Sequence, residues 1–313
     1  MKKQFPSSSF LRLSLTTLAL ILCPSVYALD VNVAPSGDIQ AAIDRVAASG
    51  GGTVNIGAGQ GLLRSTLKIK SHVTLNGAGT PQTTLTIGGN FSGIQNATEG
   101  LTHVTIQNLK LAGTGEKTSN QCNGIIIASL KTYHTAIKLN NVQVLNCGGM
   151  GVHIKRADGV NITNCSFHHN GGFTLMHNFY IRESRNATLA NSRMTESPSG
   201  TGLHVAGVCT NIHIINNVFA NNGSQGINVQ DSPTGIIIQG NTCTGNGTSD
   251  SYRSDGIAFT GTHALIENNT SNNNVGFGIH TWNGSGVLNN NRASGNKKAN
   301  YNIHGTFTQQ NNQ

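Results

Sequence analysis

Charged residues are scarce in this chain of 313 residues. Lys, Arg, Asp and Glu make up 10% of it, against about 25% in an average globular protein, and Pro (6) and Trp (1) are also few. Gly and Asn are abundant instead, at 39 residues each, and 36% of the residues are hydrophobic. This composition excludes a coiled coil and a disordered chain, and the absence of a three-residue glycine period excludes collagen.

Only one long apolar run is present, over residues 13–23. Three cations and no acidic residue precede it, and residues 26–28 form a small-x-small cleavage pattern, which predicts a secretory signal peptide over residues 1–28. No later run approaches the ~20 apolar residues of a membrane span. We therefore expect an exported protein, periplasmic or extracellular, with neither a membrane span nor a lipid anchor.

Five cysteines follow the predicted signal peptide, without any Cys-x-x-Cys pattern. An oxidising compartment permits disulfides, but an odd number leaves at least one thiol unpaired within the chain, and the sequence does not give the connectivity. We favour the interpretation that most of them are small buried hydrophobic residues. They are Cys122, Cys147, Cys165, Cys209 and Cys243.

A five-residue block whose third residue is Ile or Leu and whose last is Asn or Gly recurs nine times, at intervals of 22 to 33 residues. Its period of two indicates β-strands, and such a repeat without helical patterns between the copies predicts a β-solenoid. Coils stacked about 4.8 Å apart would align the aliphatic residues in a buried column and the Asn residues in a ladder at a turn. The blocks are residues 73–77, 104–108, 137–141, 160–164, 187–191, 212–216, 236–240, 264–268 and 286–290.

A second repeated strand has the form Gly-aliphatic-x-aliphatic, as in residues 124–127, 151–154 and 202–205. With these blocks in place, the coils resemble the right-handed parallel β-helix of the pectin-lyase-like superfamily. Residues 39–79 resemble the opening of secreted pectate-lyase-type proteins and mannuronan C5-epimerases.

The resemblance implies an all-β chain with three parts. It implies a right-handed parallel β-helix of about nine coils over residues 29–300, a short capping helix near residues 38–48, and a polar tail over residues 301–313. This scaffold hosts lyases, epimerases, hydrolases, tailspikes and adhesins, so the fold leaves the reaction open.

Candidate catalytic residues lie on the solvent side of the second strand. At ~4.8 Å per coil, His153, Tyr180 and His204 form one row, with Lys155 and Arg182 alongside. Removing the C5 proton of a uronate needs a cation to neutralise the neighbouring carboxylate and a base on the correct face of the sugar. The row supplies both, so we predict a catalytic site for an acidic polysaccharide, with proton transfer at Tyr180.

Residues on or beside the same face are predicted to bind substrate. Asn228 and Gln230 continue the two outward rows, while Trp282 would stack on a sugar ring or cap the fold. His177 opens the stretch His-Asn-Phe-Tyr-Ile, which resembles a His-Asn-x-Tyr-Ile segment of secreted bacterial β-helix proteins, or else it shapes the turn. A loop that could form one wall of the groove carries Asp250, Tyr252, Arg253 and Asp255.

Other chemistries have weaker support in the sequence. The Asp-Pro-His motif of mannuronan C5-epimerases, the Asp cluster of calcium-dependent pectate lyases and the polygalacturonase motifs are absent. Glu183 and Asp231, roughly 10 Å apart on alternate coils, leave hydrolysis as a minor alternative unless they lie in turns. His168 and His169 are interpreted as surface residues that point apart on an extended chain, so no metal site is predicted.

We therefore predict a secreted polyuronate lyase or C5-epimerase that acts as a monomer without a cofactor. A non-catalytic glycan-binding or surface protein on the same scaffold is the alternative. Nucleic acid is not expected as a partner, because the positive charge is modest and no phosphate-binding loop is present.

Overall fold

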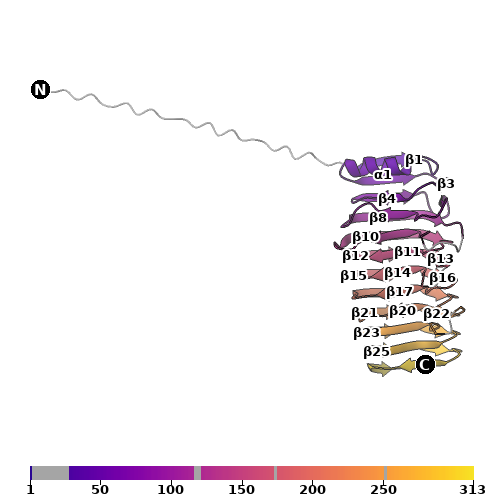
Figure 1. Ribbon diagram of the computed structural model, residues 1–313. Helices are drawn as coiled ribbons and strands as arrows, with labels where there is room; N and C mark the ends of the chain where they lie inside the picture. Colours follow the sequence, from indigo (N-terminus) through magenta and orange to yellow (C-terminus); the bar gives the residue numbers. More distant parts are fainter. Residues whose placement is uncertain (2–27, 116–120, 173–174, 250–251) are drawn as a thin grey trace.

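The computed structural model describes residue 1 and residues 28–115, 121–172, 175–249 and 252–313. Over these residues the chain winds into a right-handed parallel β-solenoid of about 11 turns (Figure 1). The predicted fold class is confirmed, but the predicted number of coils, nine, is too small. The additional coils lie at the two ends, where the strands β1 (Leu29–Val33), β2 (Gly52–Ile56) and β28 (Thr306–Gln310) lack the repeated block.

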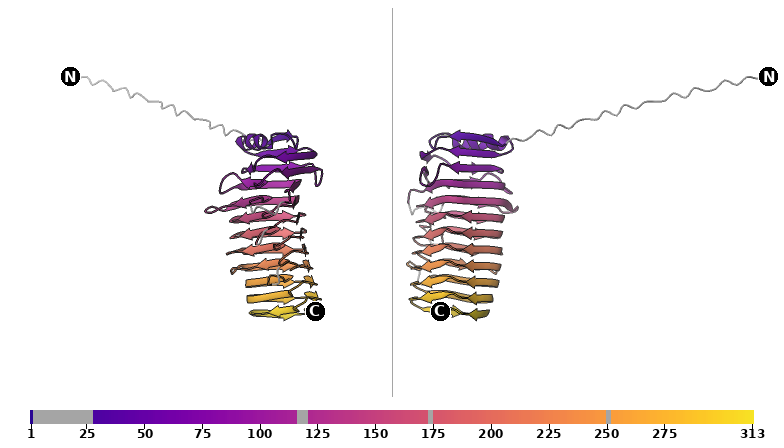
Figure 2. Two further views of the ribbon diagram at one scale, coloured as in Figure 1. Left: turned by 45° about the vertical axis from the view of Figure 1, so that its right-hand side comes forward. Right: turned by 180° about the vertical axis from the view of Figure 1, so that it is seen from behind.

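Each complete coil contributes strands to three parallel faces, and Figure 2 shows the stacked coils from two further sides. The first face consists of β1, β2, β5 (Val73–Gly77), β8 (Thr102–Ala112), β10 (His134–Leu145), β12 (Ala157–Thr163), β15 (Arg185–Ala190), β18 (Thr210–Ile215), β21 (Thr234–Gln239), β23 (Ile257–Glu267), β25 (Phe277–Asn289) and β28.

The second face continues from the first after a turn, and β8 and β10 are long enough to run through both. Its other strands are β3 (Gly59–Leu63), β6 (Thr83–Ile87), β13 (Ser166–His168), β16 (Arg193–Thr195), β19 (Val218–Ala220), β22 (Thr242–Thr244), β24 (Thr270–Asn272) and β26 (Arg292–Ser294).

The third face is built from the Gly-aliphatic-x-aliphatic strands, and it includes the first parts of β23 and β25. Its other strands are β4 (Leu67–Ile69), β7 (Ile94–Asn96), β9 (Ile125–Ala128), β11 (Val152–Lys155), β14 (Phe179–Arg182), β17 (Leu203–Ala206), β20 (Ile227–Val229) and β27 (Ala299–Ile303).

The predicted interior column of the first face is buried throughout. Its residues pair in register from coil to coil and none is more than 3% exposed. Burying one such side chain contributes about 1.5–3 kcal/mol, so the column is a main source of stability. It consists of Ile106, Leu139, Ile162, Leu189, Ile214, Ile238 and Ile266.

Asparagines hold the turn between the first and second faces, but at two different positions. The Asn that ends each repeated block takes the left-handed backbone conformation, with φ between 51° and 57°. The next residue forms the long buried ladder, in which each side-chain Nδ2 donates to the Oδ1 of the next coil at 2.9–3.1 Å. This ladder runs through Asn217, Asn241, Asn269, Asn291 and Asn312.

The two ends of the solenoid differ from one another. Helix α1 (Ile39–Ala48) covers the first coil with Ile39, Ile43 and Val46, and the Asp38 side chain accepts a hydrogen bond from the Ala41 N–H at 2.9 Å. The predicted capping helix is thus confirmed. The predicted tail over residues 301–313 is wrong, because β27 and β28 both pair with β25 and form a further coil. The sequence of this coil is polar because it is the last of the solenoid and covers core residues on one side only.

The predicted signal peptide lies almost entirely in residues 2–27, outside the described residues. Within the described part of the chain, no helix has the length and apolarity to cross a membrane. All five cysteines are buried, as predicted, and the hydrogen bond between the Cys122 and Cys147 side chains, followed by burial, raises the pKa of Cys147.

Candidate functional site

The third face presents the predicted row of side chains to the outside. Strands β11, β14 and β17 pair in parallel, with His153 opposite Tyr180 and Tyr180 opposite His204. The ring centroids are 5.0 Å apart for the first pair and 5.1 Å for the second. Asn228 on β20 extends the row by one coil. The period-two pattern therefore placed these four residues correctly.

His177 joins this row from the loop before β14. Its Nδ1 accepts a hydrogen bond from the Thr201 backbone N–H at 3.1 Å, so in the neutral ring the proton sits on Nε2. That Nε2 lies 3.0 Å from Nδ1 of His204 and donates to it. His204 must then carry its own proton on Nε2, a buried atom without a hydrogen-bond partner among the described residues. A backbone amide thus sets the tautomer of both rings.

The three histidines are held neutral. Burial, then the charges of Lys155 and Arg182, lower the pKa of His153 from 6.5 to about 4. Burial lowers the pKa of His204 to about 4 as well, although Asp231 opposes the shift. The pKa of His177, which is buried completely, lies well below its ordinary value for the same reason. At neutral pH the row consists of uncharged imidazoles.

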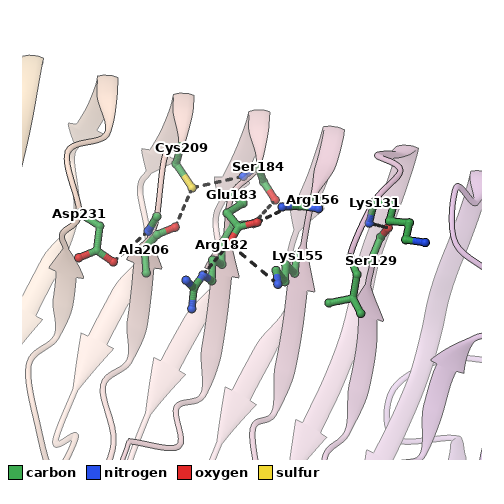
Figure 3. Close-up of polar contacts among 12 residues, drawn as sticks. Ser129, Lys131, Lys155, Arg156, Arg182, Glu183, Ser184, Ala206, Cys209 and Asp231 are labelled. Carbon is green, nitrogen blue, oxygen red and sulfur yellow. Dashed lines mark hydrogen bonds and ion pairs between the residues drawn. The ribbon is translucent and has the colours of Figure 1, made fainter.

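The predicted cations are partly paired, which the sequence did not indicate. Glu183, at the turn after β14, contacts Arg156 at 2.8 Å, Arg182 at 3.0 Å and Lys155 at 3.9 Å (Figure 3). Three cations around one carboxylate still leave two positive charges. The pKa of Arg182 is raised, first by its hydrogen bond with Tyr180, so this guanidinium also links the cluster to the row.

The two carboxylates that kept hydrolysis as an alternative lie in turns, where each contacts other groups of the protein. Glu183 and Asp231 both have positive φ, at 48° and 69°. The pKa of Glu183 is lowered, because its three cations outweigh burial, and Asp231 accepts a hydrogen bond from the Gly207 N–H at 3.1 Å. An inverting glycosidase needs one protonated carboxyl group, which Glu183 does not supply.

A groove adjoins the row. Two hollows on this face, of about 480 and 70 Å³, share Asn228, Gln230 and Arg253 in their linings. The smaller of these two reaches His177 and His204, and the larger reaches Trp282.

The predicted substrate-binding residues therefore meet in one place. His177, Asn228, Gln230 and Trp282 all line the joined hollows, whereas the remaining predicted residues continue the same face next to them. Of the residues expected in the groove wall, Tyr252 and Arg253 line the larger hollow; Asp250 lies outside the described residues.

Trp282 does not occupy the row position expected from the sequence. The register between β23 and β25 shifts after Phe259, so Thr260 pairs with Asn283 and Trp282 is the additional residue of a bulge. Its side chain is 58% exposed and stacks on His280 at 4.6 Å. The indole therefore forms a solvent-exposed part of the groove lining.

A buried hydrogen-bonded pair beneath this indole was missed. Nδ1 of His280 lies 2.9 Å from Oδ2 of Asp255, and Oδ1 of Asp255 accepts from the Phe277 N–H at 2.8 Å. Asp255 was expected in the groove wall but is 1% exposed. The 25-residue separation gives no local motif; the only available signal was the place of His280 in the outward row.

His168 and His169 were expected to point apart, and this is wrong. Their Nδ1 atoms are 2.8 Å apart, because His169 has a φ of 56° and so leaves the alternating pattern of an extended strand. Glu196 of the next coil lies 3.6 Å from His169.

Comparisons with known proteins agree with this architecture. The family model described as the right handed beta helix region matches residues 92–251 and 177–313. No curated protein sequence matches the chain significantly.

Solved structures of similar fold have different activities. ORF18 of Geobacillus virus E2 superposes with a TM-score of 0.73 at 18% identity, over 87% of this chain and 57% of the viral protein. An alginate lyase from Paenibacillus sp. str. FPU-7 gives 0.69 at 14% identity, over 88% and 99% of the two chains. PfbA, a surface adhesin of Streptococcus pneumoniae, gives 0.68 at 16% identity, over 88% and 86%. At such identities the likeness extends to the fold alone.

Proposed function

Because the chain belongs to the family of right-handed β-helix proteins, we propose that it is an exported, polysaccharide-active member of that family and acts on a polyuronate as a lyase or C5-epimerase. The observation that carries this proposal is the row of His153, Tyr180 and His204, which stands beside a cluster with two surplus positive charges. The alginate lyase from Paenibacillus gives this proposal a precedent on the same scaffold.

The cationic cluster would receive the carboxylate of the sugar. Arg182 has a side chain that is 45% exposed and a planar guanidinium suited to a carboxylate, while Lys155 is 21% exposed. A bound uronate would compete with Glu183 for these cations. Neutralising its charge makes the C5 proton more acidic, which is the requirement of both reactions.

Tyr180 would transfer the proton, with the two imidazoles dividing the other tasks. The neutral His204 offers Nε2–H as a hydrogen-bond donor to the charge that develops on the sugar. His153 is unprotonated at neutral pH and can take up the proton that Tyr180 passes on. The ring of Tyr180 lies between the two imidazoles, and its hydroxyl is hydrogen-bonded to the Arg182 guanidinium that would hold the carboxylate.

The two reactions share the first step and differ in the second. In β-elimination the C5–H and C4–O bonds break, a C4–C5 double bond forms, and the leaving oxygen takes a proton. In epimerisation a proton returns to C5 from the opposite face. The row supplies more than one proton-transfer group, as either outcome requires.

The groove favours a polymer over a single sugar. It runs from His204 past Asn228 to the bulge at Trp282, across several coils about 4.8 Å apart. The exposed rings of Tyr252 and Trp282 provide flat surfaces for sugar stacking.

Incubation with alginate or pectate in deuterated buffer tests the proposal. A lyase produces an unsaturated, ultraviolet-absorbing sugar, and an epimerase replaces the C5 hydrogen by deuterium, which nuclear magnetic resonance detects. If neither product forms with any polyuronate, the catalytic proposal is wrong.

A non-catalytic glycan-binding role is the second candidate. The exposed aromatic rings of the groove favour it, and a surface adhesin shares the fold. Binding of oligouronates by calorimetry without any chemical change would select this function.

A further inference from the structure

A cluster outside the groove has the composition of a transition-metal site. His168 ends β13, His169 follows it in the turn, and Glu196 follows β16 on the next coil. One ligand atom from each lies within 4.8 Å of the others, with the two Nδ1 atoms 2.8 Å apart and His169 Nδ1 3.6 Å from Glu196 Oε2. We propose that these three side chains bind a divalent transition cation such as Zn²⁺.

The separations suit a tetrahedral ion. Zn–N and Zn–O bonds of about 2.0–2.1 Å place two ligands of a tetrahedron roughly 3.3 Å apart. The observed 2.8 and 3.6 Å lie on either side of that value, so small side-chain rotations suffice. Two imidazoles and one carboxylate leave a fourth position for water. Hard cations such as Mg²⁺ and Ca²⁺ prefer oxygen ligands and fit this set less well.

The backbone position of two of the ligands sets them apart from their counterparts on other coils. From β10 onward, the residue after each second-face strand has positive φ, a conformation that favours Gly and Asn. The neighbouring coils follow this preference with Asn146 above and Asn221 below. Only His169 and Glu196 depart from it among the described coils from Asn146 onward, and they face each other. The turn geometry therefore does not explain why His169 and Glu196 stand where other coils have Asn or Gly.

The surroundings support a metal-bound imidazole. As placed, the amide Nε2 of Gln143 lies 2.8 Å from Nε2 of His168, on the side of the ring away from the cluster. A half turn of its amide presents Oε1 to this nitrogen, which fixes Nδ1 as the unprotonated ligand atom.

A bound ion would join two coils at the base of a functional loop. Asn170 follows His169 directly, and its N–H donates to Oδ1 of Asn178 at 3.2 Å. His177 precedes Asn178, so the cluster is continuous with the segment that delivers His177 to the row. An ion bound there would link two adjacent coils and would be separate from the proposed catalytic groups.

Zinc titration of the full chain, without a histidine tag and after treatment with a chelator, tests the site. Isothermal calorimetry should detect one Zn²⁺ per chain, and X-ray absorption should show two imidazole ligands. His169→Asn installs the residue found at the same turn one coil earlier, so the fold should persist, and Glu196→Gln removes only the charge. Each should weaken zinc binding about tenfold or more.

His263→Asn is the matched control, because His263 is exposed, also has positive φ, and lies at another corner of the solenoid. It should leave zinc affinity unchanged. The proposal is overturned if the wild-type chain binds no Zn²⁺, or if His169→Asn and Glu196→Gln both bind it as tightly as wild type.

Discussion

Acidification from pH 7 to pH 5 should lower the free energy of unfolding, because His153 becomes protonated in the unfolded chain while it stays neutral in the folded one. The pKa of this imidazole falls from 6.5 to about 4 on folding, because burial and then Lys155 and Arg182 oppose its charge. Below pH 6.5 the unfolded chain therefore takes up a proton that the folded chain does not, and the free energy of unfolding decreases until the pH passes about 4. The decrease is about 2 kcal/mol at pH 5 and about 3 kcal/mol in full.

His153→Asn isolates this contribution. Asn228 occupies the same outward row three coils further on, so the row accommodates an amide. Other buried histidines, such as His134 and His177, also have lowered pKa values and lose stability in the same range. The informative quantity is therefore the difference between wild type and variant.

Urea denaturation followed by circular dichroism at pH 7, 6 and 5 measures that difference. The free energy of unfolding should fall by about 2 kcal/mol less in His153→Asn than in wild type. The pKa values of Glu183 and Asp158 are lowered, so the titration of these two carboxylates moves to lower pH, away from the range of the comparison. His263→Asn, at an exposed site, should fall in parallel with wild type. An equal fall in wild type and His153→Asn would refute the reasoning.

Three further outcomes follow from the fold and the site. Ile214→Asp places a charge in the fully buried column and should abolish the folded state, seen as loss of the β signal in circular dichroism. Asn241→Ala removes a buried amide of the asparagine ladder that donates to Ile214 O at 2.8 Å and to Asn269 Oδ1 at 3.0 Å; denaturation should show a loss of about 3–5 kcal/mol, and a loss under 1 kcal/mol would contradict the ladder's role. Arg182→Ala should weaken oligouronate binding, and raising salt should weaken it in wild type, because exposed charges are screened over about 8–10 Å; salt-independent calorimetry would argue against carboxylate recognition.

The regular part of the fold was predictable because it repeats. A period-two block with Ile or Leu at its centre can bury that residue in only one register, so the core column and the row through Tyr180 followed directly. The end coils were missed because their strands lack the block: β28, for example, reads Thr-Phe-Thr-Gln-Gln and looks like a polar tail.

The irregular parts of the site were not predictable from strand periodicity. His169 leaves the alternation through a positive φ, and Trp282 leaves it through a bulge. Glu183 pairs with Lys155 and Arg156 of the preceding coil as well as with Arg182 beside it. Asp255 pairs with His280 of the following coil. Partners in neighbouring coils are 25 to 28 positions apart in the sequence, and only the stacking of the coils brings them together. The hydrogen bond from Thr201 that sets the His177 tautomer likewise spans two coils.

The most direct test of the proposed function is the rate of C5 proton removal from a polyuronate by wild type and by Tyr180→Phe. The substitution deletes only the hydroxyl and keeps the ring between His153 and His204, so thermal unfolding should be unchanged. If the phenol transfers the proton, steady-state turnover should fall by about 100-fold or more. Full activity in Tyr180→Phe would contradict the account of this row.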